Sequence, residues 1–326
     1  MVRFKIKDKI YGYEIITEPL IIDLIKSQPF QRLKKLNQFG IPNKYYHIKN
    51  FSRYEHSLGV MILIKRLGGS VQEQVAGLLH DLSHTAFSHL VDWVIGDAGG
   101  NESYQDNRHE KVINSNPIKG ILLKHGYDPK IIADYHNYKL LEKDAPDLCA
   151  DRVDYAFREF PVSVSKKLFK SLINKDNEIV MKDERSAFEF GKSFLKLQRN
   201  HWGGYQAVTR YRLLSNILKF AIKNKIINFN QFLKDDEYVI DKLIKSKNNY
   251  VVTSLKILTK KKIKLLKNNE IVFKKFRYVD PKFIVDNCSV RLSEYNSKYK
   301  ELLDREIVHN KKGVKVSILR LHLSKN

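Results

Sequence analysis

Apolar residues recur at helical spacing along most of the first half of the chain. Residues 4–10 alternate basic and apolar side chains, which is typical of a strand, and helical patterns follow from Pro19 and from Phe30. Further helices are predicted at residues 56–67, 71–80, 109–115, 118–125, 128–135 and 147–159. The glycine-rich, polar stretch 96–108 predicts an exposed loop between them. We therefore expect a helical core over residues 1–160, with a boundary near Pro161.

The pattern changes along the second half. Residues 184–226 are compatible with a long helix interrupted at Gly203 and Gly204, and residues 229–245 form another amphipathic segment. Four short β-rich stretches follow, at residues 250–253, 271–273, 288–292 and 314–319. The fold class predicted is mainly α, with a helical extension over 161–249 that completes the active-site pocket and a small basic α+β appendage over 250–326.

Composition excludes several classes of protein. Of 326 residues 43% are hydrophobic, which argues against a disordered chain. The two cysteines, Cys149 and Cys288, have no metal-binding spacing and exclude a disulfide scaffold. The N-terminus lacks the apolar block of a signal peptide, and lysines interrupt the apolar runs before any could span a bilayer. The sequence predicts a cytoplasmic protein without a membrane partner.

Charge is distributed unevenly along the chain. The net charge is +23; residues 1–160 hold 22 basic and 20 acidic side chains, and residues 161–326 hold the remaining 37 and 16. A polycationic half favours a polyanionic partner such as nucleic acid. Codon bias in an AT-rich genome gives the same excess of lysine, and the lysines interleaved with apolar residues over 256–267 also fit a solvated helix face.

Histidine and carboxylate residues cluster in the near-neutral half. Eight of the eleven histidines lie between residues 47 and 136. The pair His80-Asp81 ends an apolar helical segment, where a buried carboxylate needs a partner such as a metal ion. Alone, this pair would more often be a capped helix terminus. With His56 upstream and Asp151 downstream, a divalent metal site is the better interpretation.

These residues resemble a known family. The order His56, His80-Asp81, Asp151 is similar to the metal site of the HD phosphohydrolase superfamily. The surrounding residues resemble its dNTP triphosphohydrolase branch, which includes the SAM- and HD-domain enzyme and bacterial dGTPases. The matching segments are FQRL at 30–33, Gln38 with Gly40, RYEHSLG at 53–59, LHDLSH at 79–84, FSH at 87–89 and ADRVDY at 150–155, with a weaker echo in RYVDP at 277–281.

The resemblance implies a role for each matching side chain. Those implied to bind the catalytic metal are His56, His80, Asp81 and Asp151. Those implied to act on the scissile bond are His89 as the acid for the leaving oxygen, Asp92 and His109 as its orienting pair, with Glu110 as support, and His84 at the α-phosphate. Those implied to bind the nucleotide are Arg53 and Arg152 at the phosphates, Tyr155 and Tyr205 beside the sugar, Glu159 at the 3′-hydroxyl, and Gln38 at a part of the nucleotide that the resemblance does not specify.

Structural alternatives stand beside these roles. His84 could cap a helix, His89 could be a core histidine, His109 could lie at the surface, and Tyr155 could serve only in packing. The family commonly has His-Lys after the Tyr-Gln pair, where this chain has Ala207-Val208. A phosphate contact from that helix therefore depends on Arg210 or Arg212.

Three functions are open at this stage. The resemblance implies a metal-dependent phosphohydrolase that converts a dNTP to deoxynucleoside and triphosphate, with Mn, Fe or Mg as cofactor and Zn or Ni also compatible, in a homo-oligomer. The alternative is an HD-type phosphodiesterase, a 3′–5′ exonuclease on single-stranded nucleic acid, which the basic half favours. The third is a nucleic-acid-binding protein with a vestigial site. Because the predicted catalytic set lies in the near-neutral half, we expect the excess positive charge to lie outside the phosphate-binding site.

Overall fold

The N-terminal residues form a β-hairpin. In the computed structural model, which describes residues 3–96, 104–264 and 269–317, strands β1 (Phe4–Asp8) and β2 (Gly12–Ile16) pair antiparallel. The Asp8 carboxylate closes the turn by accepting hydrogen bonds from the backbone amides of Ile10 and Tyr11, and Gly12 has a φ of +80°. The predicted strand is therefore confirmed for its first five residues.

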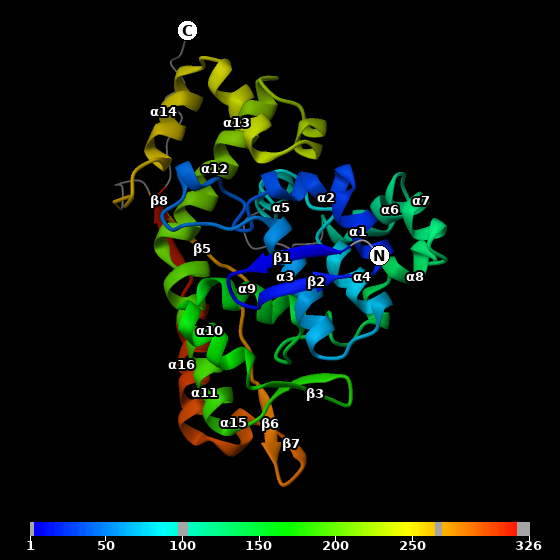
Figure 1. Cartoon of the computed structure of the whole chain (residues 1–326). Helices are drawn as coiled ribbons and strands as arrows, with labels where there is room; N and C mark the ends of the chain where they lie inside the picture. Colours follow the sequence, from blue (N-terminus) through cyan, green and yellow to red (C-terminus); the bar gives the residue numbers. More distant parts are fainter. Residues whose placement is uncertain (1–2, 97–103, 265–268, 318–326) are drawn as a thin grey trace.

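A bundle of helices lies within residues 1–160 (Figure 1), and its buried core continues into later residues such as Phe190 and Tyr299. Its helices are α1 (Pro19–Lys26), α2 (Gln28–Arg32), α3 (Arg53–Arg66), α4 (Val71–Leu79), α5 (Leu90–Ile95), α6 (Asp106–Ile113), α7 (Ile118–Lys124), α8 (Pro129–Ala133) and α9 (Ala150–Glu159), with short 3-10 turns at Leu33–Lys35, Asn43–Tyr45 and Tyr135–Asn137. None of the described helices in the chain is long and apolar enough to cross a membrane.

Helix α3 lies at the centre of this bundle. A capping box of Ser52 and Glu55 starts it, and all its residues from His56 to Ile64 are buried. A helix that is apolar around most of its circumference must be covered on all sides. It packs against α4 and α9, and this arrangement brings the ends of three helices together.

The long helical pattern over 184–226 is confirmed with its interruption. Helix α11 (Glu184–Leu197) continues into a π-helical turn, Gln198–Trp202, and Gly203 and Gly204 precede α12 (Tyr205–Lys223). The remaining helical elements are α10 (Val162–Phe169), the 3-10 turn Phe229–Leu233, α13 (Asp236–Lys245), α14 (Asn249–Leu258), α15 (Leu292–Tyr295) and α16 (Ser297–Lys311).

One predicted strand is a helix. Residues 250–253 lie in α14, where Asn248 caps the N-terminus and Val251, Leu255 and Leu258 are buried on one face. That face packs against α12, so tertiary packing outweighs the β propensity of the Tyr-Val-Val-Thr sequence. The other three stretches contain strands, although the end of the last prediction lies beyond residue 317, outside the described residues.

The C-terminal strands join the rest of the chain in small sheets. The strands are β3 (Leu172–Lys175), β4 (Glu178–Met181), β5 (Asn269–Val272), β6 (Lys282–Val285), β7 (Cys288–Arg291) and β8 (Val314–Ser317). One sheet has the order β3-β4-β6-β7, with β6 parallel to β4, and β5 pairs antiparallel with β8. Strands on both sides of residue 250 thus form one sheet, and the mainly α fold class with a small α+β C-terminal part is confirmed.

An extended segment links the two sheets. Residues 273–281, which we call the strap, connect β5 to β6 without regular secondary structure and run as an orange trace down the molecule in Figure 1. Both ends are fixed, because β5 before the strap pairs with β8, β6 after it pairs with β4 and β7, and Val279 within it is buried. The strap therefore holds its middle residues in a defined place.

Candidate active site

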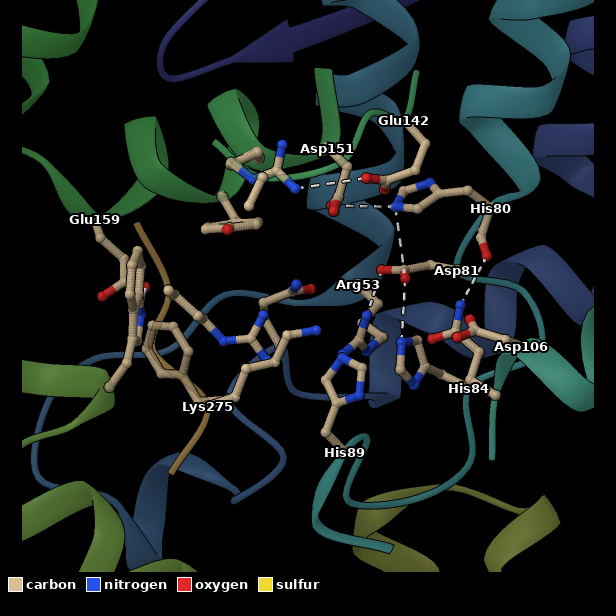
Figure 2. Close-up of a pocket in the computed structure, with 18 of the residues that line it drawn as sticks. Arg53, His80, Asp81, His84, His89, Asp106, Glu142, Asp151, Glu159 and Lys275 are labelled. Carbon is tan, nitrogen blue, oxygen red and sulfur yellow. Dashed lines mark hydrogen bonds and ion pairs between the residues drawn. The ribbon is translucent and has the colours of Figure 1, made fainter. Parts of the chain in front are cut away.

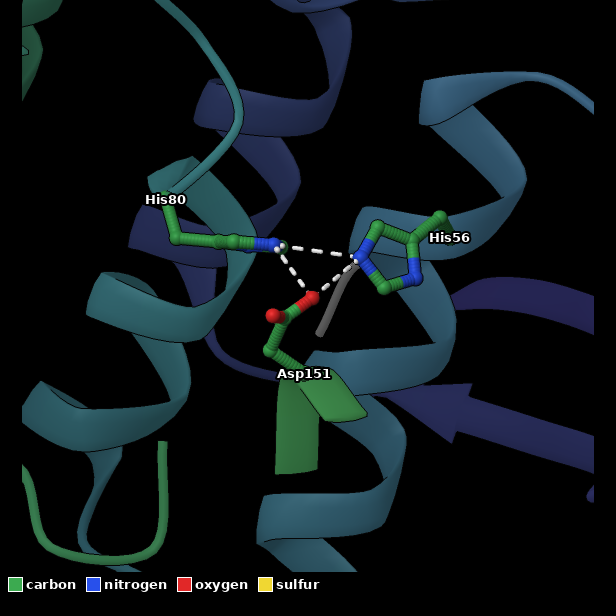
Figure 3. A group of neighbouring side chains, drawn as sticks. All are labelled: His56, His80 and Asp151. Atoms are coloured by element: carbon green, nitrogen blue, oxygen red, sulfur yellow. Dashed lines mark hydrogen bonds and ion pairs between the residues drawn. The ribbon is translucent and has the colours of Figure 1, made fainter. Parts of the chain in front are cut away.

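Three side chains from distant parts of the sequence converge on one point. The Nε2 atom of His56 in α3 lies 2.8 Å from Oδ1 of Asp151 in α9 and 3.2 Å from Nε2 of His80, which follows α4. The His80 Nε2 atom lies 3.5 Å from the same Asp151 oxygen (Figure 3). Two imidazole nitrogens and one carboxylate oxygen aimed at a common point are a ligand set for a divalent metal ion.

The opposite nitrogens of both imidazoles are held by other groups. His56 Nδ1 lies 2.7 Å from Oδ2 of Asp154, and His80 Nδ1 lies 2.8 Å from the carbonyl oxygen of Gly77. A hydrogen bond at Nδ1 fixes the ring orientation and leaves the Nε2 lone pair for a metal. Asp154 stands in the matching ADRVDY segment, but the sequence assigned it no role.

Asp81 lies beside these three residues. Its Oδ1 atom is 3.5 Å from His80 Nε2 and 3.2 Å from His84 Nε2, and its Oδ2 atom accepts a 2.5 Å hydrogen bond from Arg53. Burial alone would raise the pKa of the Asp81 carboxyl, but Arg53, His80 and His84 outweigh burial and hold that pKa well below its usual range. Asp81 is therefore ionised and within reach of the predicted metal position.

The electrostatics of the site fit a cation. Burial works against protonation of His56, but Asp151 and Asp154 outweigh it and raise its pKa to about 9. A place that stabilises a buried imidazolium also stabilises a metal ion bound to the neutral ring. The donors and their charges thus fit the divalent metal that the sequence predicts.

A cavity of about 500 Å³ opens directly onto these residues (Figure 2). His80, Asp81 and Asp151 line one side of the cavity, and Tyr155, Glu159 and Trp202 line another. Two polar atoms at its wall, Arg53 Nη2 and Gln38 Oε1, are buried without a hydrogen-bond partner among the described residues. Buried polar atoms ordinarily have partners, so a ligand that enters the cavity is the natural partner for both.

The far end of the cavity contains a hydrogen-bonded group that the sequence did not reveal. Glu159 Oε2 lies 2.5 Å from His201 Nδ1, and Glu159 Oε1 accepts a 2.7 Å bond from the Trp202 indole. The His201 Nε2 atom lies 2.7 Å from the hydroxyl of Tyr46. The sequence assigned His201 and Trp202 no role, because their positions depend on the π-helical turn. The only sequence signal for a site here is that a histidine and a tryptophan stand directly before the helix break at Gly203-Gly204.

The predicted acid His89 and the neighbouring His84 lie on the metal side of the cavity. The rings of His84 and His89 are edge to face, 4.8 Å apart, and both line the cavity. His89 Nδ1 is 3.9 Å from Asp92 Oδ2. His109 is only 2% exposed, so it is no surface residue; it lies 3.4 Å from Ser83 Oγ and packs on Tyr135. Burial lowers the pKa of His109 to about 3, which keeps its ring neutral.

Two predicted nucleotide contacts have other partners. Arg152 lines the cavity, but its guanidinium donates to the carbonyl oxygens of Asp147 and Lys143. The Tyr205 hydroxyl is 2.8 Å from Ser317 Oγ, and among the described residues the cavity is lined by Tyr211 and not by Tyr205. The break before α12 sets its rotation, which the sequence does not give.

The arginines considered as substitutes on α12 are also engaged elsewhere. Arg210 donates to the Gln206 side chain and to the Lys260 carbonyl oxygen, each at 2.5 Å. Arg212 pairs with Glu270. Ala207 lines the cavity instead, so α12 presents an apolar residue where a cation was sought.

Comparisons with known proteins agree with this geometry. The family model of the HD domain matches residues 53–158. An uncharacterized protein of Bacillus subtilis, YdhJ, is 35% identical over 97% of this chain and 99% of its own length. The metal-dependent phosphohydrolase cns2 of Cordyceps militaris is 30% identical over 65% of each chain. Human deoxynucleoside triphosphate triphosphohydrolase SAMHD1 is 32% identical over 38% of this chain and 23% of its own.

A solved structure shares the fold. The crystal structure of a hypothetical protein from Aquifex aeolicus superposes with a TM-score of 0.64 and 21% identity, covering 92% of this chain and 93% of that one. The family match spans α3 to α9 and therefore includes His56, Asp81 and Asp151. The chain belongs to the HD-domain superfamily of metal-dependent phosphohydrolases.

Proposed function

We propose that this protein is a deoxynucleoside triphosphate triphosphohydrolase, which converts a dNTP and water to a deoxynucleoside and triphosphate. The observation that carries the proposal is a single cavity that joins the metal ligands to an aromatic and acidic end. Its volume of about 500 Å³ is in the range of cavities that hold ligands of nucleotide size. The similarity to SAMHD1 over part of the chain supports the same substrate class.

Helix α9 supplies the spacing that the substrate needs. Asp151, Tyr155 and Glu159 follow one another at four-residue intervals, so they lie on one face about 6 Å apart along the helix axis. The Tyr155 ring packs against Trp202, with 5.4 Å between ring centroids. In our proposal the α-phosphate lies near Asp151, the sugar near Tyr155, and the 3′-hydroxyl near Glu159.

The residues at the metal side divide the chemistry between them. His56, His80, Asp81 and Asp151 would hold a divalent cation, for which we propose Mn²⁺, Fe²⁺ or Mg²⁺, and such a cation supplies hydroxide near neutral pH. Arg53 offers its unpaired Nη2 atom to a phosphate oxygen.

His89 gives the proton that the departing 5′-oxygen needs, and Asp92 orients the His89 ring. The α-phosphorus–oxygen bond to the sugar breaks, and the hydroxide oxygen remains on the triphosphate. His84, which lies between Asp81 and His89, contacts the α-phosphate.

Product analysis tests this proposal. The purified protein is incubated with Mn²⁺ and each dNTP, and triphosphate is separated from pyrophosphate and monophosphate. Deoxynucleoside and triphosphate in equal amounts would support the proposal. Shortening of labelled single-stranded DNA without nucleoside release from any dNTP would favour the exonuclease alternative. Absence of both reactions in metal-loaded protein would reject both enzymatic functions.

A further inference from the structure

The cations near the metal site already have partners. Arg53 is paired with Asp81, Arg152 with two backbone carbonyl oxygens, and Lys143 with Glu178 at 2.5 Å. Apart from the Nη2 atom of Arg53, these groups offer little to the β- and γ-phosphates of a triphosphate. A substrate with several negative charges needs further cations in the cavity.

The strap brings three such cations into the cavity from the opposite side. Lys274, Lys275 and Arg277 all line it. The Lys274 ammonium lies 4.4 Å from the centre of the Tyr211 ring and 3.5 Å from the Trp202 carbonyl oxygen. Figure 2 shows Lys275 reaching into the cavity from the side opposite His80 and Asp81. The sequence did not predict that Lys274, Lys275 or Arg277 lines the cavity.

The strap backbone is held in place on either side of these cations. The Arg277 amide donates to Gln198 Oε1 at 3.4 Å, and Tyr299 donates to the Val279 carbonyl oxygen at 2.5 Å. The Asp280 carboxylate accepts hydrogen bonds from Ser293. Arg277 and Tyr155 both line the cavity, so the Arg277 charge lies in the space that the nucleotide would occupy.

We propose that the strap is a polyphosphate clamp, in which Lys274, Lys275 and Arg277 bind the β- and γ-phosphates of the nucleotide while the metal side acts on the α-phosphate. The nature of the nucleotide rests on the proposed function. In this proposal, three of the basic residues that make the C-terminal half strongly positive bind the phosphates of the substrate. Phosphate binding by the clamp requires no cation from α12, where Ala207 is apolar and Arg210 and Arg212 have other partners.

Binding of inorganic triphosphate to the full chain tests the clamp without any need for hydrolysis. Affinities are measured by calorimetry, in metal-free buffer and again with Mn²⁺. Lys275 is exposed, so Lys275→Ala should leave the fold unchanged and weaken triphosphate binding about tenfold. Lys275→Glu should weaken it further, and Lys275→Arg should retain it. Adding Arg277→Ala to Lys275→Ala should bring the loss to about a hundredfold.

The matched control is Lys256→Ala, which removes the same charge from the exposed side of α14. Triphosphate affinities of Lys275→Ala and of the double variant within twofold of the control would overturn the clamp. If the clamp variants lose triphosphate binding but no dNTP is hydrolysed by the native protein, the clamp stands and the proposed function fails. If dNTPs are hydrolysed and the strap variants bind triphosphate normally, the proposed function stands and the clamp fails.

Discussion

The His56 imidazole is held from behind by Asp154, whose Oδ2 atom lies 2.7 Å from His56 Nδ1. Asp154 is itself fixed by Arg158, at 2.7 Å, and by the hydroxyl of Tyr11, at 2.9 Å. Tyr11 lies between the strands of the N-terminal hairpin, so the hairpin takes part in orienting a proposed metal ligand. The outer partner of a ligating histidine controls both its tautomer and its basicity.

Replacing Asp154 by asparagine should weaken metal binding. The Asp154→Asn variant retains the shape of the side chain but removes the charge that supports His56, so we expect metal affinity to fall 10- to 100-fold. The measurement is competition for Mn²⁺ against a chelating dye, with thermal unfolding recorded in parallel. Asp304→Asn, at an exposed position of α16, is the matched control. Unchanged affinity in a folded Asp154→Asn protein would contradict the role of Asp154.

Metal affinity should rise with pH. In the metal-free protein the pKa of His56 is about 9, and a metal ligand must be neutral at Nε2. Below pH 9 each metal ion therefore displaces a proton, and the affinity should tighten about tenfold per pH unit between pH 7 and 9, then level off. Burial opposes protonation of His80, but Asp81 and Asp151 raise its pKa as well, so titration calorimetry in two buffers of different ionisation enthalpy should detect at least one proton released per metal ion at pH 7.5. An affinity that is constant from pH 7 to 9 would refute this assignment.

Glu159 should affect the substrate rather than the metal. The Glu159→Gln variant loses the charge that holds His201 and Trp202, so we expect KM for the hydrolysed dNTP to rise about tenfold while metal content stays unchanged. Steady-state kinetics and metal analysis of the same preparation provide both values. Glu301→Gln, on the exposed side of α16, is the control. A Glu159→Gln variant with normal KM, or one that lacks metal, would contradict a role of Glu159 in substrate binding.

Gly59 should tolerate no side chain. A methyl group at this position of α3 would lie 2.0 Å from Asp154 Oδ1 and 2.1 Å from Arg158 Nη2. The Gly59→Ala variant should therefore lose about 2 kcal/mol or more of unfolding free energy, despite the better helix propensity of alanine. Denaturant unfolding measures the change. Gly120→Ala in α7, at an exposed position, should be neutral or stabilising, and equal stability of the two variants would show that this close approach does not constrain the core.

The sequence predicted the metal side of the site better than the rest. His56, His80 and Asp151 lie at helix ends or on helices whose apolar patterns were clear, so helix packing brings their ligand atoms together, and Asp81 directly follows His80. Gly59 shows why a glycine follows His56 by three residues: the Asp154–Arg158 pair occupies the space of its side chain. These features depend on regular helices, whose periodicity can be read directly from a sequence.

The far end of the cavity depends on features without a periodic signal. The π-helical turn at Gln198–Trp202 places His201, and the helix rotation after Gly204 directs Tyr205 toward β8. The β propensity of residues 250–253 was overruled by packing against α12. We expected the excess positive charge to lie outside the phosphate-binding site, but the strap carries Lys274, Lys275 and Arg277 to the cavity because a sheet fixes each of its ends.

The fate of oxygen from solvent tests the central claim most directly. A dNTP is hydrolysed with Mn²⁺ in ¹⁸O-labelled water, and both products are analysed by mass spectrometry. Attack at the α-phosphorus predicts one ¹⁸O atom in the triphosphate and none in the deoxynucleoside. Label in the deoxynucleoside, or labelled monophosphate with pyrophosphate, would contradict the reaction that we propose.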